Sequence, residues 1–185
     1  MPRRFRDIMV DYPHHVTQRG NNKELVFKTD SDYEKYLYIA EDCRGKYNLL
    51  ILSYCLMPNH IHFIVVPKDK ESLSRFFNTC HMRYTQYFNK KYYRIGHLWQ
   101  GRFFSCALDE RHLYTAIKYV ETNPLKANIE KSIGEWKWAS TRFRLHNAIY
   151  SILQIEDSKK KLGMTGEEYR AYLLEGIDDI VLETI

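Results

Sequence analysis

The sequence contains no long hydrophobic run, no Cys-x-x-Cys pair and no low-complexity segment. A membrane-spanning helix needs about 20 consecutive apolar residues, and the N-terminal stretch MPRRFRDIMVDY lacks the hydrophobic segment of a signal peptide. We therefore expect no contact with a membrane. The scattered cysteines have apolar surroundings, which is typical of reduced core residues in a cytoplasmic protein and argues against a zinc ribbon. They are Cys43, Cys55, Cys80 and Cys106.

Charged residues are plentiful but unevenly distributed. Hydrophobic residues make up 44% of the 185 residues, which suffices for a globular domain and excludes a disordered chain. Residues 1–147 contain 24 basic and 15 acidic side chains, whereas residues 148–185 contain four and eight. We interpret the chain as a basic domain (1–147) followed by an acidic helical extension (148–185). The basic domain favours a polyanionic partner such as nucleic acid over an ordinary lysine-rich surface.

Hydrophobic periodicity predicts an α+β fold for the basic domain. The predicted strands are residues 13–20, 49–56, 60–66 and 102–108, and the predicted helices are residues 31–46, 72–90 and 109–123, the last ending before Pro124. This β-α-β-β-α-β order is that of a ferredoxin-like antiparallel sheet. We expect residues 136–140 to pack back onto the domain, and two appended C-terminal helices at residues 149–161 and 167–174.

Two histidines stand at the entrance of the strand predicted over residues 60–66. Side chains alternate across a strand, so His60 and His62 point to the same face, directly after the turn residues 57–59. A single histidine at a strand end is usually a hydrogen-bonded structural residue. Two neutral imidazoles on one face, however, can bind one cation together, so the pair is a candidate metal site.

The helix predicted over residues 109–123 supplies partners for such a site. Tyr119 and Asn123, four residues apart, fall on one flank of its apolar stripe, whereas Tyr114 falls on the opposite flank. A tyrosine at a helix edge usually packs with its hydroxyl in water. Tyr119 and Asn123, but not Tyr114, can therefore face the sheet together.

These residue types together are suited to one kind of chemistry. A tyrosine hydroxyl, with a pKa of about 10, is a poor nucleophile unless its target is strongly electrophilic. Two imidazoles and an amide oxygen leave positions on a divalent cation open for phosphate oxygens, and such a cation would stabilise a leaving 3′-oxygen. The product would be a 5′-phosphotyrosine and a free 3′-hydroxyl, formed without a nucleotide cofactor or water.

Four stretches, MPNHIHFIV, HHVTQRGNN, LWQGRFFS and YVETNPLKANI, together resemble single-tyrosine HUH transposases of the insertion-sequence 200/605 type, most of all the REP-associated tyrosine transposases. The resemblance implies that His60 and His62 are the metal-binding HUH pair, with Tyr119 as the nucleophile. It also implies that Asn123 is the third ligand. The implied activity is cleavage and rejoining of single-stranded DNA beside hairpins of inverted-repeat or REP-like sequence, with Mg²⁺ or Mn²⁺, in the cytoplasm at the nucleoid.

Basic and aromatic residues are interleaved in the domain, which suits phosphate neutralisation and base stacking on unpaired DNA. Among them we select Arg19, Trp99 and Arg102 as DNA-binding residues. The sequence leaves open whether the active site is completed within one chain or in a homodimer, and what the C-terminal extension does.

Three other functions compete with this interpretation. A non-catalytic single-stranded nucleic-acid-binding module of ferredoxin-like fold has the same element order, but carries aromatic residues on the central strands where this chain has His60 and His62. A replication initiator or plasmid relaxase shares the chemistry, but the short chain without a helicase region disfavours it. A metal-dependent phosphodiesterase needs acidic ligands, and Glu121 falls on the wrong helix face.

Overall fold

The computed structural model describes residues 8–146, 153, 155 and 163–175. Its centre is a four-stranded antiparallel sheet of order β2-β3-β1-β4. The strands are β1 (His14–Arg19), β2 (Leu49–Met57), β3 (His60–Pro67) and β4 (Phe104–Ala107). This strand order, with helices after β1 and β3, confirms the predicted ferredoxin-like fold.

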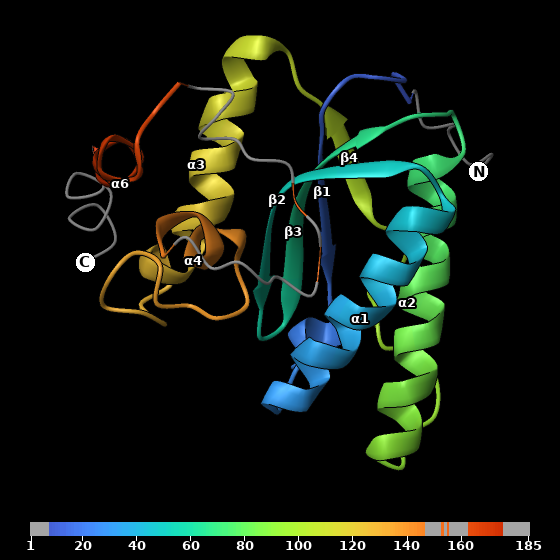
Figure 1. Ribbon diagram of the computed structural model, residues 1–185. Coiled ribbons are helices and arrows are strands. Elements are labelled where there is room, and N and C mark those ends of the chain that lie inside the picture. Colours follow the sequence, from blue (N-terminus) through green and yellow to red (C-terminus); the bar gives the residue numbers. More distant parts are fainter. Residues whose placement is uncertain (1–7, 147–152, 154, 156–162, 176–185) are drawn as a thin grey trace.

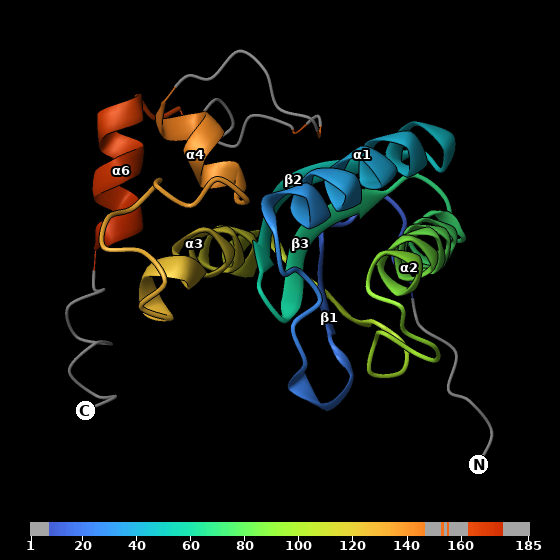
Figure 2. The same cartoon turned by 90° about the horizontal axis from the view of Figure 1, so that it is seen from below.

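Helices cover both faces of the sheet (Figures 1 and 2). α1 (Asp30–Lys46) and α2 (Ser72–Lys91) lie on one face, and α3 (Glu110–Lys126) packs on the other face against β2 and β3. The hydrophobic core has one cluster on each face of the sheet, and the two differ in composition. The cluster beneath α1 and α2 is rich in aromatic residues, and the cluster beneath α3 is mainly aliphatic. β2 and β3 are buried on both sides, which explains their continuous apolar sequences.

The end of α3 differs from the prediction. The helix continues through Pro124 to Lys126, whereas the sequence predicted an end at Asn123. A proline in a helix removes one backbone donor, but close to the C-terminus few further bonds depend on it. The final turn is closed by the Ala127 N–H, which donates to the Asn123 carbonyl, and by the Ile129 N–H, which donates to the Pro124 carbonyl. Asn123 therefore lies within the helix, one full turn beyond Tyr119.

The chain after α3 returns to the sheet, in agreement with the prediction for residues 136–140. The indole N–H of Trp136 donates to the carbonyl of Leu56 in β2 at 2.9 Å. The short helix α4 (Ser140–Leu145) follows directly. This return places α4 against the middle of β2 and beside α3 (Figure 1).

The described part of the C-terminal extension is the helix α6 (Gly166–Leu174). Its N-terminus has the predicted cap, because Thr165 and Glu168 form a reciprocal capping box. Tyr169 and Leu173 are buried together with Ile133, so α6 packs on α3 and α4. The helix predicted over residues 149–161 lies almost entirely outside the described residues.

Glu121 is a buried carboxylate that joins α3 to three other elements. Its Oε1 accepts hydrogen bonds from Ser53 of β2 at 3.0 Å and Ser140 of α4 at 2.8 Å, and it pairs with the buried guanidinium of Arg144. Its Oε2 accepts a hydrogen bond from the Tyr169 hydroxyl of α6 at 3.1 Å. A buried charge is costly unless it is paired and hydrogen-bonded, and Glu121 meets both conditions.

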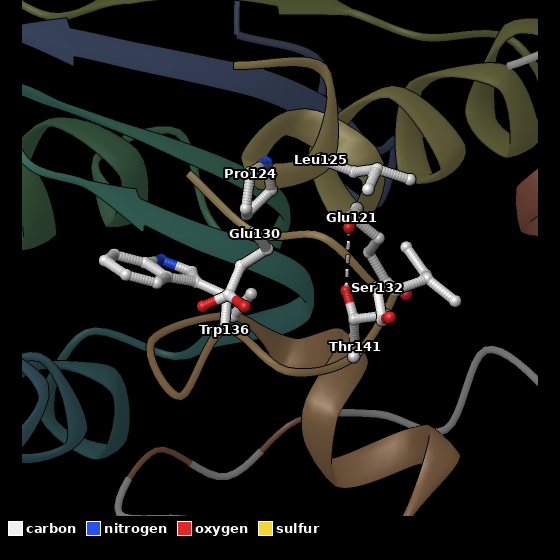
Figure 3. A pocket seen from close by; sticks show the side chains of 10 residues that line it. Glu121, Pro124, Leu125, Glu130, Ser132, Trp136 and Thr141 are labelled. Carbon is white, nitrogen blue, oxygen red and sulfur yellow. Dashed lines mark hydrogen bonds between the residues drawn. The ribbon is translucent and has the colours of Figure 1, made fainter. Parts of the chain in front are cut away.

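The small pocket beside Glu121 is a packing feature. Its volume is about 10 Å³, which holds about one water molecule. Figure 3 shows Thr141 opposite Glu121, and the Thr141 hydroxyl donates to the Glu121 backbone carbonyl at 3.1 Å. The pocket is thus too small for a substrate or a nucleotide.

Three of the four cysteines are buried as predicted, but Cys106 is exposed. Cys106 lies in β4, a short strand at the edge of the sheet, and alternate side chains of this strand point to solvent. Among the helices that the structure describes, none combines the length and apolarity needed to cross a bilayer.

Stability should fall in mild acid because of His81. Burial lowers the pKa of His81 to about 3, whereas an unfolded histidine has a pKa of about 6.5. The unfolded chain therefore binds a proton below about pH 6.5 that the folded protein rejects, which removes about 2 kcal/mol of stability between pH 7 and pH 5. In urea denaturation at both pH values, His81→Gln should reduce this loss by about 2 kcal/mol. The exposed control His97→Gln should leave it unchanged; an equal loss in His81→Gln and the wild type would contradict the prediction.

Tyr169→Phe should destabilise the protein by about 1–3 kcal/mol, because it removes a hydrogen bond to a buried carboxylate and keeps the ring. The matched control is Tyr172→Phe in the same helix, where the side chain is only partly buried and the change should stay within about 0.5 kcal/mol. Urea denaturation at pH 7 measures both values. Equal stability of the two variants would show that the bond to Glu121 contributes nothing.

Candidate active site

An open cleft of about 480 Å³ lies where the end of β1 meets the start of β3. The antiparallel register sets Thr17 opposite His62 and Arg19 opposite His60, and directly opposed residues share a face of the sheet. The cleft is lined by residues from β1, β3, β4, α3 and the segment leading into β4: His15, Thr17, Gln18, Arg19, His60, His62, Gln100, Arg102, Phe104 and Tyr119. The structure therefore gathers most of the predicted site residues in one place.

His60 and His62 lie side by side in this cleft, with ring centroids 4.9 Å apart and ring planes nearly perpendicular. Burial, together with nearby Arg19, lowers the pKa of His60 to about 4. Burial, followed by His60, His15 and Arg19, lowers the pKa of His62 to about 3. Both imidazoles are therefore neutral near pH 7, which is the state in which a ring nitrogen binds a metal.

α3 brings Tyr119 and Asn123 to the same histidine. The Tyr119 ring lies edge-on to His62 with centroids 5.6 Å apart, and its side chain is 43% exposed on the cleft wall. Asn123 is buried, with Nδ2 at 3.5 Å from Nε2 of His62. The predicted common flank of these two residues is thus seen in the structure.

Tyr114 lies on a different side of α3. It is not among the residues that line the cleft, whereas Tyr119 is. The helix register therefore separates the two tyrosines, as the sequence predicted.

His60, His62 and Asn123 could hold a divalent cation. Within the described residues, no group of three His, Cys, Asp or Glu side chains could do so. The carboxylate of Glu121 is committed to Arg144 on another side of α3. Two neutral imidazoles and a carboxamide add no negative charge, so a cation held by them would retain its attraction for phosphate oxygens.

The predicted DNA-binding residues separate into two groups. Arg19 and Arg102 are exposed on the cleft wall, where a phosphate could reach them. The side chain of Trp99, in contrast, is only 8% exposed and stacks on His81 with centroids 4.4 Å apart. Trp99 is therefore a core residue, and the prediction that it binds DNA is wrong. Phe104, which is 63% exposed in the cleft, is an aromatic side chain that unpaired bases could contact.

Sequence reasoning did not identify His15. Its Nε2 lies 3.1 Å from Nδ1 of His62, and its ring centroid lies 6.1 Å from that of Tyr119. Alternation along β1 puts His15 on the same face as Thr17 and Arg19. Only the pairing of β1 with β3 shows that this face is also the face of His62.

Comparisons with known proteins show the family and the fold of this chain. The family described as Transposase IS200 like matches residues 9–123, which is more than half of the chain. The REP-associated tyrosine transposase bound to a REP hairpin has the same fold, with a TM-score of 0.67 and 17% identity over 85% of this chain and 93% of that chain.

A candidate transposase from Deinococcus radiodurans R1 is more distant, with a TM-score of 0.46 and 13% identity over 65% of this chain and 97% of that chain. No curated protein sequence matches the chain. The match to the family over residues 9–123 decides the assignment: this chain belongs to the IS200-like transposases.

Proposed function

We propose that this transposase cleaves and rejoins single-stranded DNA beside hairpins through a 5′-phosphotyrosine intermediate, with Mg²⁺ or Mn²⁺ as cofactor. The observation that carries the proposal is the position of Tyr119, which lies against His62 in the cleft that also contains His60. Family membership supports DNA processing, and the structural relative was solved bound to a REP hairpin.

His60, His62, Asn123 and Tyr119 carry the chemistry of the proposed reaction. His60, His62 and Asn123 would hold the cation, which when bound polarises the scissile phosphate. Tyr119 attacks the phosphorus atom and gives up its proton. The new O–P bond forms as the bond to the 3′-oxygen breaks, and the leaving strand takes a proton at this oxygen to give a free 3′-hydroxyl. One phosphodiester replaces another, so attack by a 3′-hydroxyl reverses the step and rejoins the DNA.

Arg19 and Arg102 would position the DNA backbone in the cleft. Both are exposed there, and a guanidinium can contact a phosphate through two hydrogen bonds. Exposed Phe104 offers a face for an unpaired base. A duplex hides the base faces, so the substrate is single-stranded next to the hairpin.

A non-catalytic nucleic-acid-binding module is the main alternative. Such modules keep one face of the sheet open so that bases can stack on its central strands. Here α3 covers β2 and β3 on that face, and the remaining open part contains imidazoles. The arrangement therefore favours catalysis at one phosphate over binding across the sheet.

Tyr119→Phe should abolish covalent attachment to DNA, because it removes the attacking oxygen and keeps the ring. Tyr114→Phe, the matched control on the same helix, should retain it. The measurement is denaturing electrophoresis after incubation with Mn²⁺ and single strands labelled on the 5′-phosphate side of the cleaved bond. A covalent band that persists in Tyr119→Phe, or is lost only in Tyr114→Phe, would refute the assignment of the nucleophile.

His60→Ala and His62→Ala should each slow strand cleavage at least about 100-fold, because loss of the cation removes several kcal/mol of transition-state stabilisation. Hairpin affinity, which depends mainly on phosphate and base contacts, should change little. Cleavage assays and fluorescence anisotropy measure the two effects, with His97→Ala as the control. The proposed metal site fails if the double variant cleaves at the wild-type rate, or if a chelator leaves the wild type fully active.

A further inference from the structure

His60 and His62 share a feature that the proposed function does not by itself require. A neutral imidazole binds a cation only through the ring nitrogen that carries no hydrogen, and the partner of the other nitrogen decides which one that is. In both His60 and His62, Nδ1 is the nitrogen with a close protein partner, Asn59 for one and His15 for the other.

Asn59 determines the hydrogen position in His60. The Nδ2 of Asn59 donates to the carbonyl of Lys23 at 3.4 Å, which leaves its Oδ1 facing Nδ1 of His60 at 2.6 Å. A carboxamide oxygen only accepts hydrogen bonds, so the hydrogen of His60 lies on Nδ1. The lone pair of His60 is then on Nε2.

The same reasoning applies to His62, where two contacts point to one arrangement. Nε2 of His62 faces the donor Nδ2 of Asn123 at 3.5 Å, and its Nδ1 faces Nε2 of His15 at 3.1 Å. If the hydrogen of His62 were on Nε2, this N–H would face the N–H group of Asn123, and two donors cannot form a hydrogen bond. A hydrogen on Nδ1 instead lets His62 donate to His15 and leaves Nε2 as an acceptor.

We propose that His15 is a positioning residue that holds His62 with its hydrogen on Nδ1, as Asn59 holds His60, so that both Nε2 lone pairs are available to one divalent cation. The proposal rests on the proposed function for the identity of the ligand, but not for the hydrogen positions. Thr17 of β1 lies opposite His62, and His15 is two residues before Thr17. The side chain of His15 therefore lies on the same face of the sheet, diagonal to His62.

Partners that orient metal-binding histidines typically contribute 10- to 100-fold to metal affinity. His15→Leu removes the acceptor and should weaken Mn²⁺ binding by about 10- to 100-fold. His15→Gln provides an oxygen acceptor in place of Nε2 and should restore most of the affinity. His97→Gln, which removes an exposed histidine outside the cleft, is the matched control and should bind like the wild type.

The direct test is the hydrogen position in the metal-free protein. Two-bond ¹H–¹⁵N correlation spectra distinguish a protonated from an unprotonated ring nitrogen. We expect the hydrogen on Nδ1 of His60 and His62 in the wild type and in His15→Gln, and a mixture of both forms at His62 in His15→Leu. Circular dichroism and urea denaturation identify any variant that fails to fold, and His15→Gln keeps the test decisive if His15→Leu does.

The outcomes separate this inference from the proposed function. Wild-type His62 with its hydrogen on Nε2, or His15→Leu with unchanged spectra and Mn²⁺ affinity, would overturn the inference. A loss in His15→Gln as large as in His15→Leu would also overturn it, because His15 would then be a ligand itself. If titration calorimetry with Mn²⁺ alone shows no binding to the wild type while the spectra show the expected hydrogen positions, the metal proposal fails and the positioning of His62 stands.

Discussion

The antiparallel pairing of β1 with β3 is the interaction on which the candidate site depends. Backbone hydrogen bonds set Thr17 opposite His62 and Arg19 opposite His60, so residues about 45 positions apart in the sequence share one face. A shift of one residue would turn His15 and Arg19 to the opposite face, into the aromatic core beneath α1 and α2. The apolar residues that alternate with the histidines, Ile61 and Phe63, oppose such a shift because they are fully buried.

The second requirement is the orientation of α3, and a buried ion pair contributes to it. Glu121 lies between Tyr119 and Asn123 in the sequence but points to β2, α4 and α6, where four side chains satisfy its carboxylate. A rotation of α3 about its axis would leave this charge buried without partners, at a cost of several kcal/mol. The same helix thus presents a nucleophile candidate on one flank and an anchor on another, and the C-terminal helix α6 takes part in the anchor.

Burial lowers the pKa of three histidines, His60, His62 and His81, but they lie in two different environments. His81 is enclosed between Tyr36 and Trp99, is hydrogen-bonded to the Tyr36 hydroxyl and has no access to the cleft, so it is a core residue. His60 and His62 are also neutral because of burial, but they line the cleft, where their lone pairs can meet a ligand. A low pKa alone therefore does not distinguish a core histidine from a histidine of the cleft, whereas position relative to the cleft does.

The sequence by itself determined the element order, the shared face of His60 and His62, and the common flank of Tyr119 and Asn123. Each of these follows from a local period, two residues per repeat in a strand and 3.6 in a helix. The reach of α3 through Pro124 was missed, because the cost of a proline depends on its place in the finished helix.

Only the tertiary structure decided which of the remaining residues join the site. The register of β1 against β3 places His15 in the cleft. Trp99 instead lies in the aromatic core, because its segment pairs with Gly20 and its indole stacks on His81. Cys106 became exposed because β4 lies beyond β2 and β3, the strands that α3 covers. Local periods specify the face of an element on which a residue lies, but contacts between distant segments determine what that face meets.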